Sequence, residues 1–251
     1  MKILFISDYV CPYCLVAKEA MKKALEETGI EAEITWQPFE LTIEPAQRID
    51  TYHDEVRKSH YQILVEPCKQ LELDMKLPPA VVPRPYTLLA FEGYYEAIKQ
   101  GKGDAYNERM YKAYFIEEQD IGELNVLCEL AKEVGLDVIA YKNALEQGTH
   151  AKKLQEMNQY GRNVQKIKHV PTILIDDEEI SLESYTSDEF VKILQGIRAN
   201  EQNEEGCGAE INAGGCGPEG CGAEINAGGC GPEGCGAEIN AGGCGPDGCS
   251  F

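Results

Sequence analysis

The sequence predicts an α/β fold in which an N-terminal β-α-β unit and a later β-β-α unit enclose a long helical segment. Residues 2–8 form an apolar run of strand length, and residues 12–28 carry apolar side chains at helical spacing. Residues 32–39 alternate between apolar and polar side chains, as a half-buried strand does. Because ligands of open α/β sheets bind beyond the carboxyl ends of the strands, the first strand-to-helix turn is the candidate site.

Helical patterns dominate between residues 42 and 163, where prolines and glycines separate the segments. We expect helices at 54–71, 86–100, 104–116, 123–134, 137–145 and 149–160. Asp120 stands where the N-cap of the fourth of these helices is expected. This part of the chain is therefore predicted to be an all-helical insertion.

The strand pattern resumes after the insertion, at residues 171–176 and 180–182. Thr186 and Glu189 have the spacing of a capping box, which predicts a last helix over residues 187–198. The predicted organisation has three parts: residues 1–41 and 164–200 as one α/β domain, residues 42–163 as the helical insertion, and residues 201–251 as a tail.

The tail differs in composition from the rest of the chain. From Cys207 it repeats a Cys- and Gly-rich unit three times, and it holds seven of the eleven cysteines. It has little apolar surface to bury, so we expect it to be disordered unless disulfides or metal ions fix it. In each repeat a proline-containing turn can bring two flanking cysteines together. These pairs are Cys216 and Cys221, Cys230 and Cys235, and Cys244 and Cys249.

The sequence leaves three hypotheses for the tail open. The paired cysteines exchange disulfides with a dithiol elsewhere in the chain, as a tethered substrate at high effective concentration. Alternatively, the clustered thiolates bind a soft metal such as zinc or copper(I). The third hypothesis is a recent expansion of repeats without chemistry of its own.

The motif Cys11-Pro12-Tyr13-Cys14 follows the first strand directly and opens the first helix. A helix N-terminus offers unpaired N–H groups and the positive end of the helix dipole, which stabilise a thiolate at Cys11. Pro12 suits the first helical position because it has no N–H. The two-residue spacing lets the two sulfurs meet, with Cys11 expected to be exposed and Cys14 buried. The motif therefore predicts a redox-active dithiol.

Two other interpretations of the motif are weaker. A Cys-x-x-Cys pair can be half of a zinc site, but such a site needs a second ligand pair, whereas Cys68 and Cys128 stand alone. A pair of structural cysteines would be buried, and a polar turn at the end of a strand argues against burial. The redox interpretation is preferred, and it requires no bound cofactor.

Composition restricts the partners. The formal net charge of −20 over 251 residues disfavours nucleic acid and anionic membranes, because phosphate binding depends on clustered Lys and Arg. No apolar run approaches the length of a membrane span, and the apolar run after Lys2 is too short for a secretion signal. We expect a cytoplasmic protein that acts on protein or small-molecule thiols and disulfides in a reducing compartment.

The chain resembles the DsbA family of thioredoxin-fold proteins, and within that family the FrnE-like branch. The resemblance rests on Ser7-Asp8-x-x-Cys11-Pro12-x-Cys14, on the helical stretch from Ala113-Tyr-Phe through Asp120-Ile121 to Gly135-Leu136-Asp137, and on Val170-Pro171-Thr172. It covers residues 2–198 and implies a thioredoxin-like fold that the helical insertion splits. It also implies that Cys11 attacks, that Cys14 resolves the mixed disulfide, and that Pro171 is a cis-proline facing the dithiol.

Residues near the dithiol are candidates for supporting roles. The backbone at Val170 would pair with an extended substrate segment, and Tyr13 and Thr172 would line the substrate groove. Asp8 lies near the end of the first strand and is a candidate proton acceptor for Cys14. A solvated turn cap is an equally good interpretation of Asp8.

Two comparisons within the resemblance refine the predicted function. Pro-Tyr replaces the Pro-His pair of DsbA itself, which favours a potential between those of thioredoxin (about −270 mV) and protein disulfide isomerase (about −180 mV). Relatives that isomerise 2-hydroxychromene-2-carboxylate use glutathione and have a serine at the first cysteine position, so Cys11 favours thiol chemistry. The predicted function is thiol–disulfide exchange. The alternatives are metal binding or thiol buffering through the tail, and glutathione-dependent isomerisation or transfer.

Overall fold

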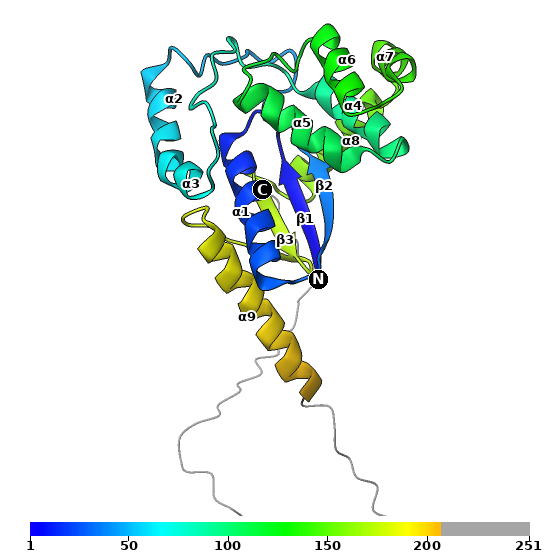
Figure 1. Ribbon diagram of the computed structural model, residues 1–251. Coiled ribbons are helices and arrows are strands. Elements are labelled where there is room, and N and C mark those ends of the chain that lie inside the picture. The colour runs from blue at the N-terminus through cyan, green and yellow to red at the C-terminus, as the bar shows by residue number, and fades with distance from the viewer. Residues whose placement is uncertain (207–251) are drawn as a thin grey trace, which may run out of the picture. The chain divides into compact units, whose positions relative to one another are not determined.

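The structure is a computed structural model that describes residues 1–206 (Figure 1). Its sheet has four strands in the order β2-β1-β3-β4. β1 pairs parallel with β2 and antiparallel with β3, and β3 pairs antiparallel with β4. The strands are β1 (Lys2–Ser7), β2 (Glu33–Pro38), β3 (Thr172–Ile175) and β4 (Glu178–Ile180). The α/β fold predicted from the sequence, with a thioredoxin-like order of elements and a helical insertion, is confirmed.

The helices follow the predicted order along the chain. They are α1 (Pro12–Thr28), α2 (Glu55–His60), α3 (Val65–Gln70), α4 (Leu88–Lys99), α5 (Gly103–Phe115), α6 (Leu124–Glu133), α7 (Val138–Glu146), α8 (Ala151–Asn163) and α9 (Ser187–Gly206). A 3-10 turn at Tyr61–Leu64 joins α2 to α3. Helix α1 ends at Gly29, whose φ of 62° is a left-handed conformation that glycine adopts without a Cβ penalty.

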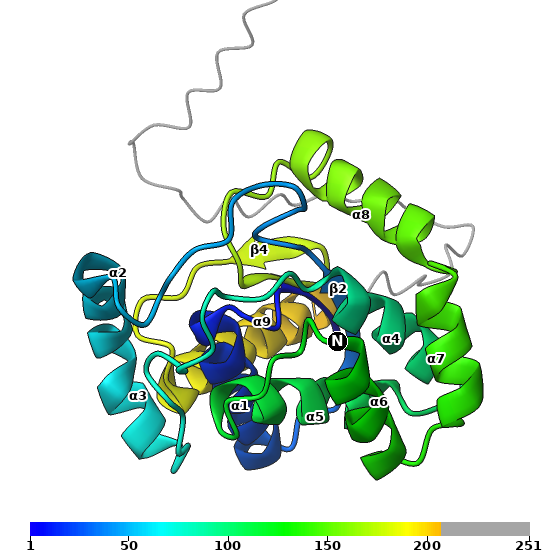
Figure 2. The ribbon, with the colours of Figure 1, turned by 90° about the horizontal axis from the view of Figure 1, so that it is seen from above.

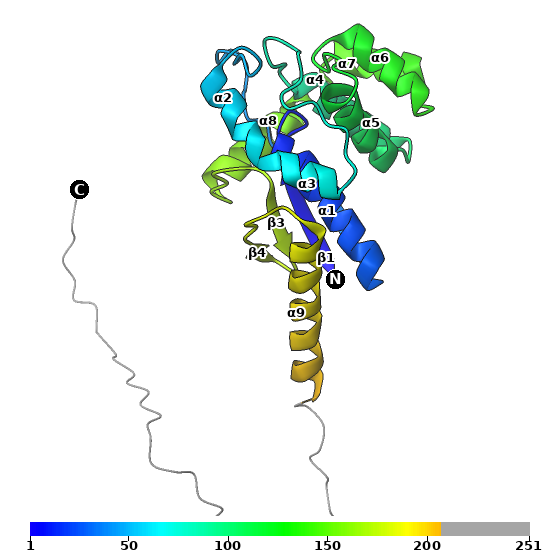
Figure 3. The same ribbon diagram turned by 60° about the vertical axis from the view of Figure 1, so that its left-hand side comes forward.

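The core of the α/β part lies between the sheet and two helices. β1 contributes Ile3, Phe5 and Ile6, and α9 contributes Phe190 and Leu194, all of which are buried. Helices α1 and α9 pack against each other, and Figure 3 shows both of them beside the sheet. This packing fixes the direction of α1, and with it the position of the dithiol at its N-terminus.

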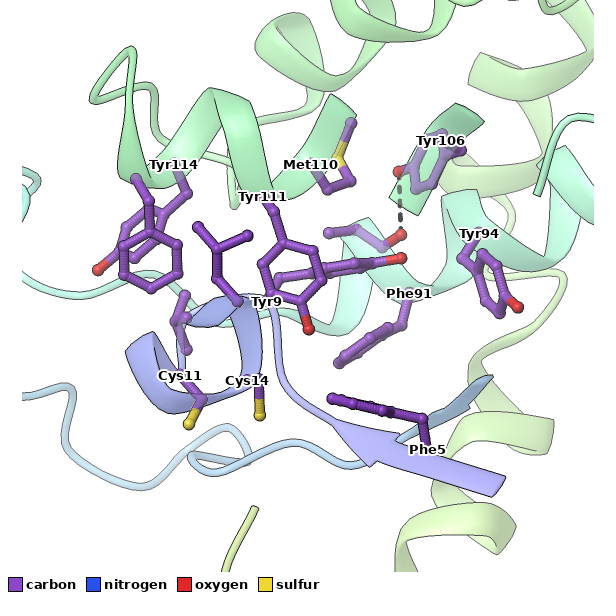
Figure 4. Packing of buried hydrophobic residues seen from close by; sticks show 14 of the residues in the cluster. Phe5, Tyr9, Cys11, Cys14, Phe91, Tyr94, Tyr106, Met110, Tyr111 and Tyr114 are labelled. Carbon is purple, nitrogen blue, oxygen red and sulfur yellow. Dashed lines mark hydrogen bonds between the residues drawn. The ribbon is translucent and has the colours of Figure 1, made fainter. Parts of the chain in front are cut away.

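The helical insertion is built around α4, which contacts α5, α6, α7 and α8 (Figure 2). Tyr9, in the loop after β1, connects this insertion to the sheet. Its ring stacks on Phe91 of α4 at 4.5 Å, and its hydroxyl donates a hydrogen bond to Asn107 of α5 (Figure 4). Helix α8 also contacts β2. The insertion is therefore packed on the end of the sheet from which the dithiol loop leaves.

Two predicted features of the insertion are wrong. The single helix expected over residues 54–71 is divided into α2, the 3-10 turn and α3. Pro67 explains the division, because it has no N–H and is tolerated only in the first turn of the helix that contains it. Asp120 is not an N-cap, since its Oδ1 accepts a hydrogen bond from the Gly122 N–H at 2.9 Å and α6 has Glu123 at its N-cap.

Helix α9 begins as predicted but is longer. Thr186 Oγ1 accepts from the Glu189 N–H at 3.3 Å, while the Glu189 carboxylate accepts from the backbone of Glu183, Ser184 and Tyr185 instead of closing a full capping box. The helix runs to Gly206 rather than to residue 198, because no proline or glycine interrupts residues 199–205. Its last turns enter the range assigned to the tail.

Candidate active site at the start of helix α1

The dithiol lies where β1 gives way to α1. The chain turns after Ser7, and the Cys11 N–H donates to the Asp8 carbonyl at 3.1 Å. Cys11 is the N-cap of α1 and has extended backbone angles, with φ −90° and ψ 115°. The Cys14 N–H donates to the Cys11 carbonyl at 3.1 Å, which closes the first turn. Both cysteines are free thiols, and Figure 4 shows their sulfur atoms on the same side of this turn.

Cys11 faces the segment that precedes β3. Its Sγ donates a hydrogen bond to the Val170 carbonyl at 3.3 Å, although 159 positions separate the two residues. The bond between Val170 and Pro171 is cis, as the resemblance implies. Thr172 pairs with Ile6 of β1, and its Oγ1 donates to the His169 carbonyl at 2.7 Å. The structure thus brings the sequence-predicted Cys11, Val170, Pro171 and Thr172 together.

The two sulfurs differ less in exposure than the sequence suggests. Cys14 is fully buried, as expected, but Cys11 is only 3% exposed instead of open to solvent. The cover over Cys11 includes Val170, whose carbonyl lies against its sulfur. Burial, followed by the hydrogen bond and charge of Cys11, raises the pKa of Cys14 well above its usual value. Cys14 is therefore held as a thiol in the dithiol form.

Three tyrosines surround the dithiol. Tyr13 donates its hydroxyl hydrogen to the His60 carbonyl at 3.0 Å, and its ring lies 5.3 Å from that of Tyr185. Burial and then the Cys11 sulfur raise the pKa of Tyr13 and of Tyr185, and burial raises that of Tyr61. The sequence pointed to Tyr13 only. Tyr61 lies in a 3-10 turn and Tyr185 in the loop before α9, so no local pattern assigns them to the site.

Asp8 is fully buried, so its interpretation as a solvated cap is wrong. Its Oδ2 accepts from the Leu41 N–H at 2.6 Å, and its Oδ1 lies 3.4 Å from the Val10 nitrogen. Burial raises the pKa of Asp8, against the opposing effects of the Leu41 N–H and the Arg84 charge. The Asp8 backbone N–H also points at the Cys14 sulfur. A buried carboxyl therefore lies beside the resolving cysteine.

Within residues 1–206, no three His, Cys, Asp or Glu side chains are grouped as a metal site would require. None of the helices in the same range has both the length and the apolar character needed to cross a membrane. The paired tail cysteines, Cys216 to Cys249, lie outside the described residues, so disulfide relay and zinc or copper binding by the tail stay predictions.

Comparison with known proteins agrees with this geometry. Residues 2–195 match the family model of the DSBA-like thioredoxin domain. The chain is 38% identical over 175 residues to the uncharacterized protein YwbO of Bacillus subtilis, which spans 69% of this chain and 86% of YwbO.

Solved structures show the same fold at lower identity. A probable DsbA oxidoreductase from Streptomyces coelicolor matches with a TM-score of 0.66 and 22% identity, over 89% of this chain and 99% of that one. A 2-hydroxychromene-2-carboxylate isomerase matches with a TM-score of 0.62 and 17% identity, over 82% and 98%. The cytosolic disulfide reductase DsbM from Pseudomonas aeruginosa matches with a TM-score of 0.58 and 15% identity, over 80% and 100%. With a dithiol at the start of α1 and a family match across most of its length, the chain belongs to the DSBA-like thioredoxin domain family.

Proposed function

We propose that this protein is a thiol–disulfide oxidoreductase that works through Cys11 and Cys14. The observation that carries the proposal is the position of Cys11, at the N-cap of α1 and 3.3 Å from the Val170 carbonyl, with Cys14 one turn behind it. The helix N-terminus favours a thiolate at Cys11, which is the form that attacks disulfides. A cysteine at this position supports thiol exchange rather than the isomerase chemistry named for one structural relative.

The first step joins enzyme and substrate. The Cys11 thiolate attacks one sulfur of a substrate disulfide, the substrate S–S bond breaks, and its other sulfur leaves as a thiolate. Val170 presents a backbone carbonyl at this point, which an extended substrate segment would use in place of the Cys11 S–H. Tyr13 and Tyr185 flank the same position. Substrate contact through backbone atoms would admit disulfides in many sequences.

The second step releases the substrate. Cys14 loses its proton and attacks Cys11 Sγ, a Cys11–Cys14 disulfide forms, and the remaining substrate sulfur leaves as a thiolate. Two electrons have then passed from the dithiol to the substrate, so the reaction needs no bound cofactor. The reverse sequence oxidises a substrate dithiol. Protein or small-molecule disulfides are the proposed substrates, and a reducing compartment such as the cytoplasm is the proposed location.

Reduction of insulin tests the proposal. With dithiothreitol as the reductant, we expect the full-length protein to accelerate insulin reduction and the Cys11→Ser variant to fall to the uncatalysed rate, because the attacking sulfur is lost. Cys128→Ser is the matched control, since Cys128 is a half-buried thiol of α6. The proposal is wrong if Cys11→Ser keeps the wild-type rate, or if Cys128→Ser loses activity to the same extent.

A further inference from the structure

The second step of the proposed reaction raises a question about protons. Cys14 has no exposed surface, and its pKa is raised, so the thiol must give its proton to a neighbour before it can attack. At that stage a substrate is attached to Cys11 and covers the groove side of the dithiol. The proton therefore needs an exit that does not pass through the substrate. The following inference rests on the proposed function and adds such an exit to it.

Asp8 is placed to take the proton first. Its backbone N–H points at the Cys14 sulfur, and its carboxyl is fully buried. Four groups face that carboxyl: the Leu41 N–H, the Val10 N–H, the Arg84 charge and the Thr87 hydroxyl. The closest contact joins the Leu41 nitrogen to Asp8 Oδ2 at 2.6 Å. This contact also brings the preceding residue, Glu40, against Asp8.

Glu40 is a second buried carboxyl, with an exposed fraction of 3%. Its Oε1 accepts from Asn158 Nδ2 at 2.8 Å, and its backbone N–H donates to Asn158 Oδ1 at 2.9 Å. Arg162 donates to the same Asn158 Oδ1 at 3.0 Å and to the Glu40 carbonyl. Helix α8 thus holds Glu40 at the exit of β2, where the Phe39 N–H donates to the Ser7 carbonyl of β1 at 2.9 Å.

The charges around Glu40 come from three elements. Asp8 follows β1, Glu92 belongs to α4 and Arg162 belongs to α8. Burial, followed by the negative charge of Asp8, raises the pKa of Glu40 to about 7, against the lowering effects of Asn158 and Arg162. Glu40 therefore changes between its protonated and ionised forms near neutral pH, which suits a group that passes protons on.

Glu40 also lines a cavity of about 600 Å³. Leu88 of α4 and residues of α8, among them Asn158 and Arg162, form the walls, and the exposed Glu44 lies at the same cavity. None of the residues lining this cavity belongs to the groove formed by Val170, Pro171 and the tyrosines around Cys11. A substrate in that groove leaves the cavity open to water.

We propose that Asp8 and Glu40 form a two-carboxyl relay that carries the Cys14 proton to the cavity beside α8 while the substrate is attached to Cys11. The S–H bond of Cys14 breaks, and the proton passes to the Asp8 carboxylate and then through Glu40 to water. The electron pair left on Cys14 forms the bond to Cys11 Sγ, and the substrate sulfur leaves with the pair of the broken S–S bond. In the oxidising direction the proton travels the same route inward.

Quenched-flow mass spectrometry of the full-length protein tests the relay, with glutathione disulfide as the substrate. The mixed disulfide on Cys11 is measured as it forms and as it decays. In Glu40→Gln we expect it to form at the wild-type rate but to decay about tenfold more slowly, or slower still, at neutral pH. The pH profile of the decay should also lose its inflection near 7. Glutamine keeps the size of Glu40 and the acceptor for Asn158 but cannot take up a proton.

Glu44→Gln is the matched control, because it removes a carboxyl from the same cavity without touching Asp8 or Asn158. It should match the wild type in both steps. Wild-type decay in Glu40→Gln, or an equal slowing in Glu44→Gln, would overturn the relay and leave the proposed function intact. Absence of any mixed disulfide on wild-type Cys11 would instead overturn the proposed function and the relay with it.

A measurement on the wild-type protein keeps the relay testable if Glu40→Gln does not fold. Infrared difference spectra between the dithiol and disulfide forms at neutral pH report carboxyl groups that change protonation. We expect a protonated-carboxyl band that changes between the two forms. Spectra without any such change would overturn the relay.

Discussion

At the scale of single residues, Glu40 shows how burial changes the chemistry of a carboxyl group in this protein. Its side chain is removed from water, and its charged form also meets the negative field of Asp8. Both effects favour the protonated form and raise its pKa from 4.5 to about 7. The hydrogen bond from Asn158 keeps the group in place. A pKa difference of this kind between folded and unfolded states must also appear in stability.

The stability of the protein should therefore depend on pH through Glu40. Between pH 4.5 and about 7 the folded state binds the Glu40 proton more tightly than the unfolded state does. This contribution is fully present below pH 4.5 and is lost as the pH rises through 7. We expect the wild type to lose about 2 kcal/mol more unfolding free energy than Glu40→Gln between pH 5 and pH 8. Urea unfolding at both pH values measures the difference.

Glu44→Gln again serves as the comparison, since Glu44 is exposed and should follow the wild type. Parallel curves for the wild type and Glu40→Gln across this range would mean that Glu40 titrates at an ordinary pKa. That result would also remove the inflection near 7 expected in the kinetics of the relay.

Some functional residues were predictable from the sequence because a local pattern contains them. Cys11 and Cys14 belong to one short motif, and Pro171 was found by its place before β3 within the family resemblance. Tyr185 and Glu40 carry no such pattern, since long-range packing brings them to the dithiol region. The full burial of Asp8 was equally hidden, because it depends on the segment after β2 and on residues before α4.

At the scale of elements, the close packing of α4 depends on a glycine. A Cβ at Gly93 would overlap the hydroxyl oxygens of Tyr106 and Tyr141, which form a hydrogen bond of 2.8 Å with each other. We expect Gly93→Ala to lower the unfolding free energy by about 2 kcal/mol or more, because neither ring has free space to move into. Thermal or urea unfolding measures the loss.

Gly196→Ala is the matched control for this substitution. Gly196 lies in α9, and a Cβ there would meet no atom within 4 Å. Alanine at this position should raise the stability by up to about 1 kcal/mol through its helix propensity. A neutral Gly93→Ala variant would show that α4 packs less closely against α5 and α7 than described.

The ends of helices were predictable where a side chain caps the backbone. Asp54 accepts from two N–H groups at the start of α2, and Asp137 does the same at the start of α7. The sequence gave no equally local reason to end α9 at residue 198, and the helix continues to Gly206. Apolar periodicity placed the elements correctly, but it did not show that Pro67 lies in the first turn of a separate helix.

At the scale of the described unit, the candidate site is assembled from parts that are distant in sequence. The exits of β1 and β2, which run parallel, supply the dithiol and the two carboxyls, and the entry of β3 supplies Val170 and Pro171. The insertion separates these parts along the chain, yet α4 and α8 complete the surroundings of Glu40. The sequence predicted the sheet and the insertion, whereas the contacts between them depend on three-dimensional packing.

The central claim is that the sulfur of Cys11 attacks the substrate. Substituting Cys14→Ser removes the resolving thiol, so the mixed disulfide should persist. After reaction with insulin, trypsin digestion separates the peptide with Cys11 from the tail, because no Lys or Arg follows Arg198. We expect mass spectrometry to find the insulin chain on the Cys11 peptide. Insulin attached only to the tail or to Cys128, with none on Cys11, would contradict the claim.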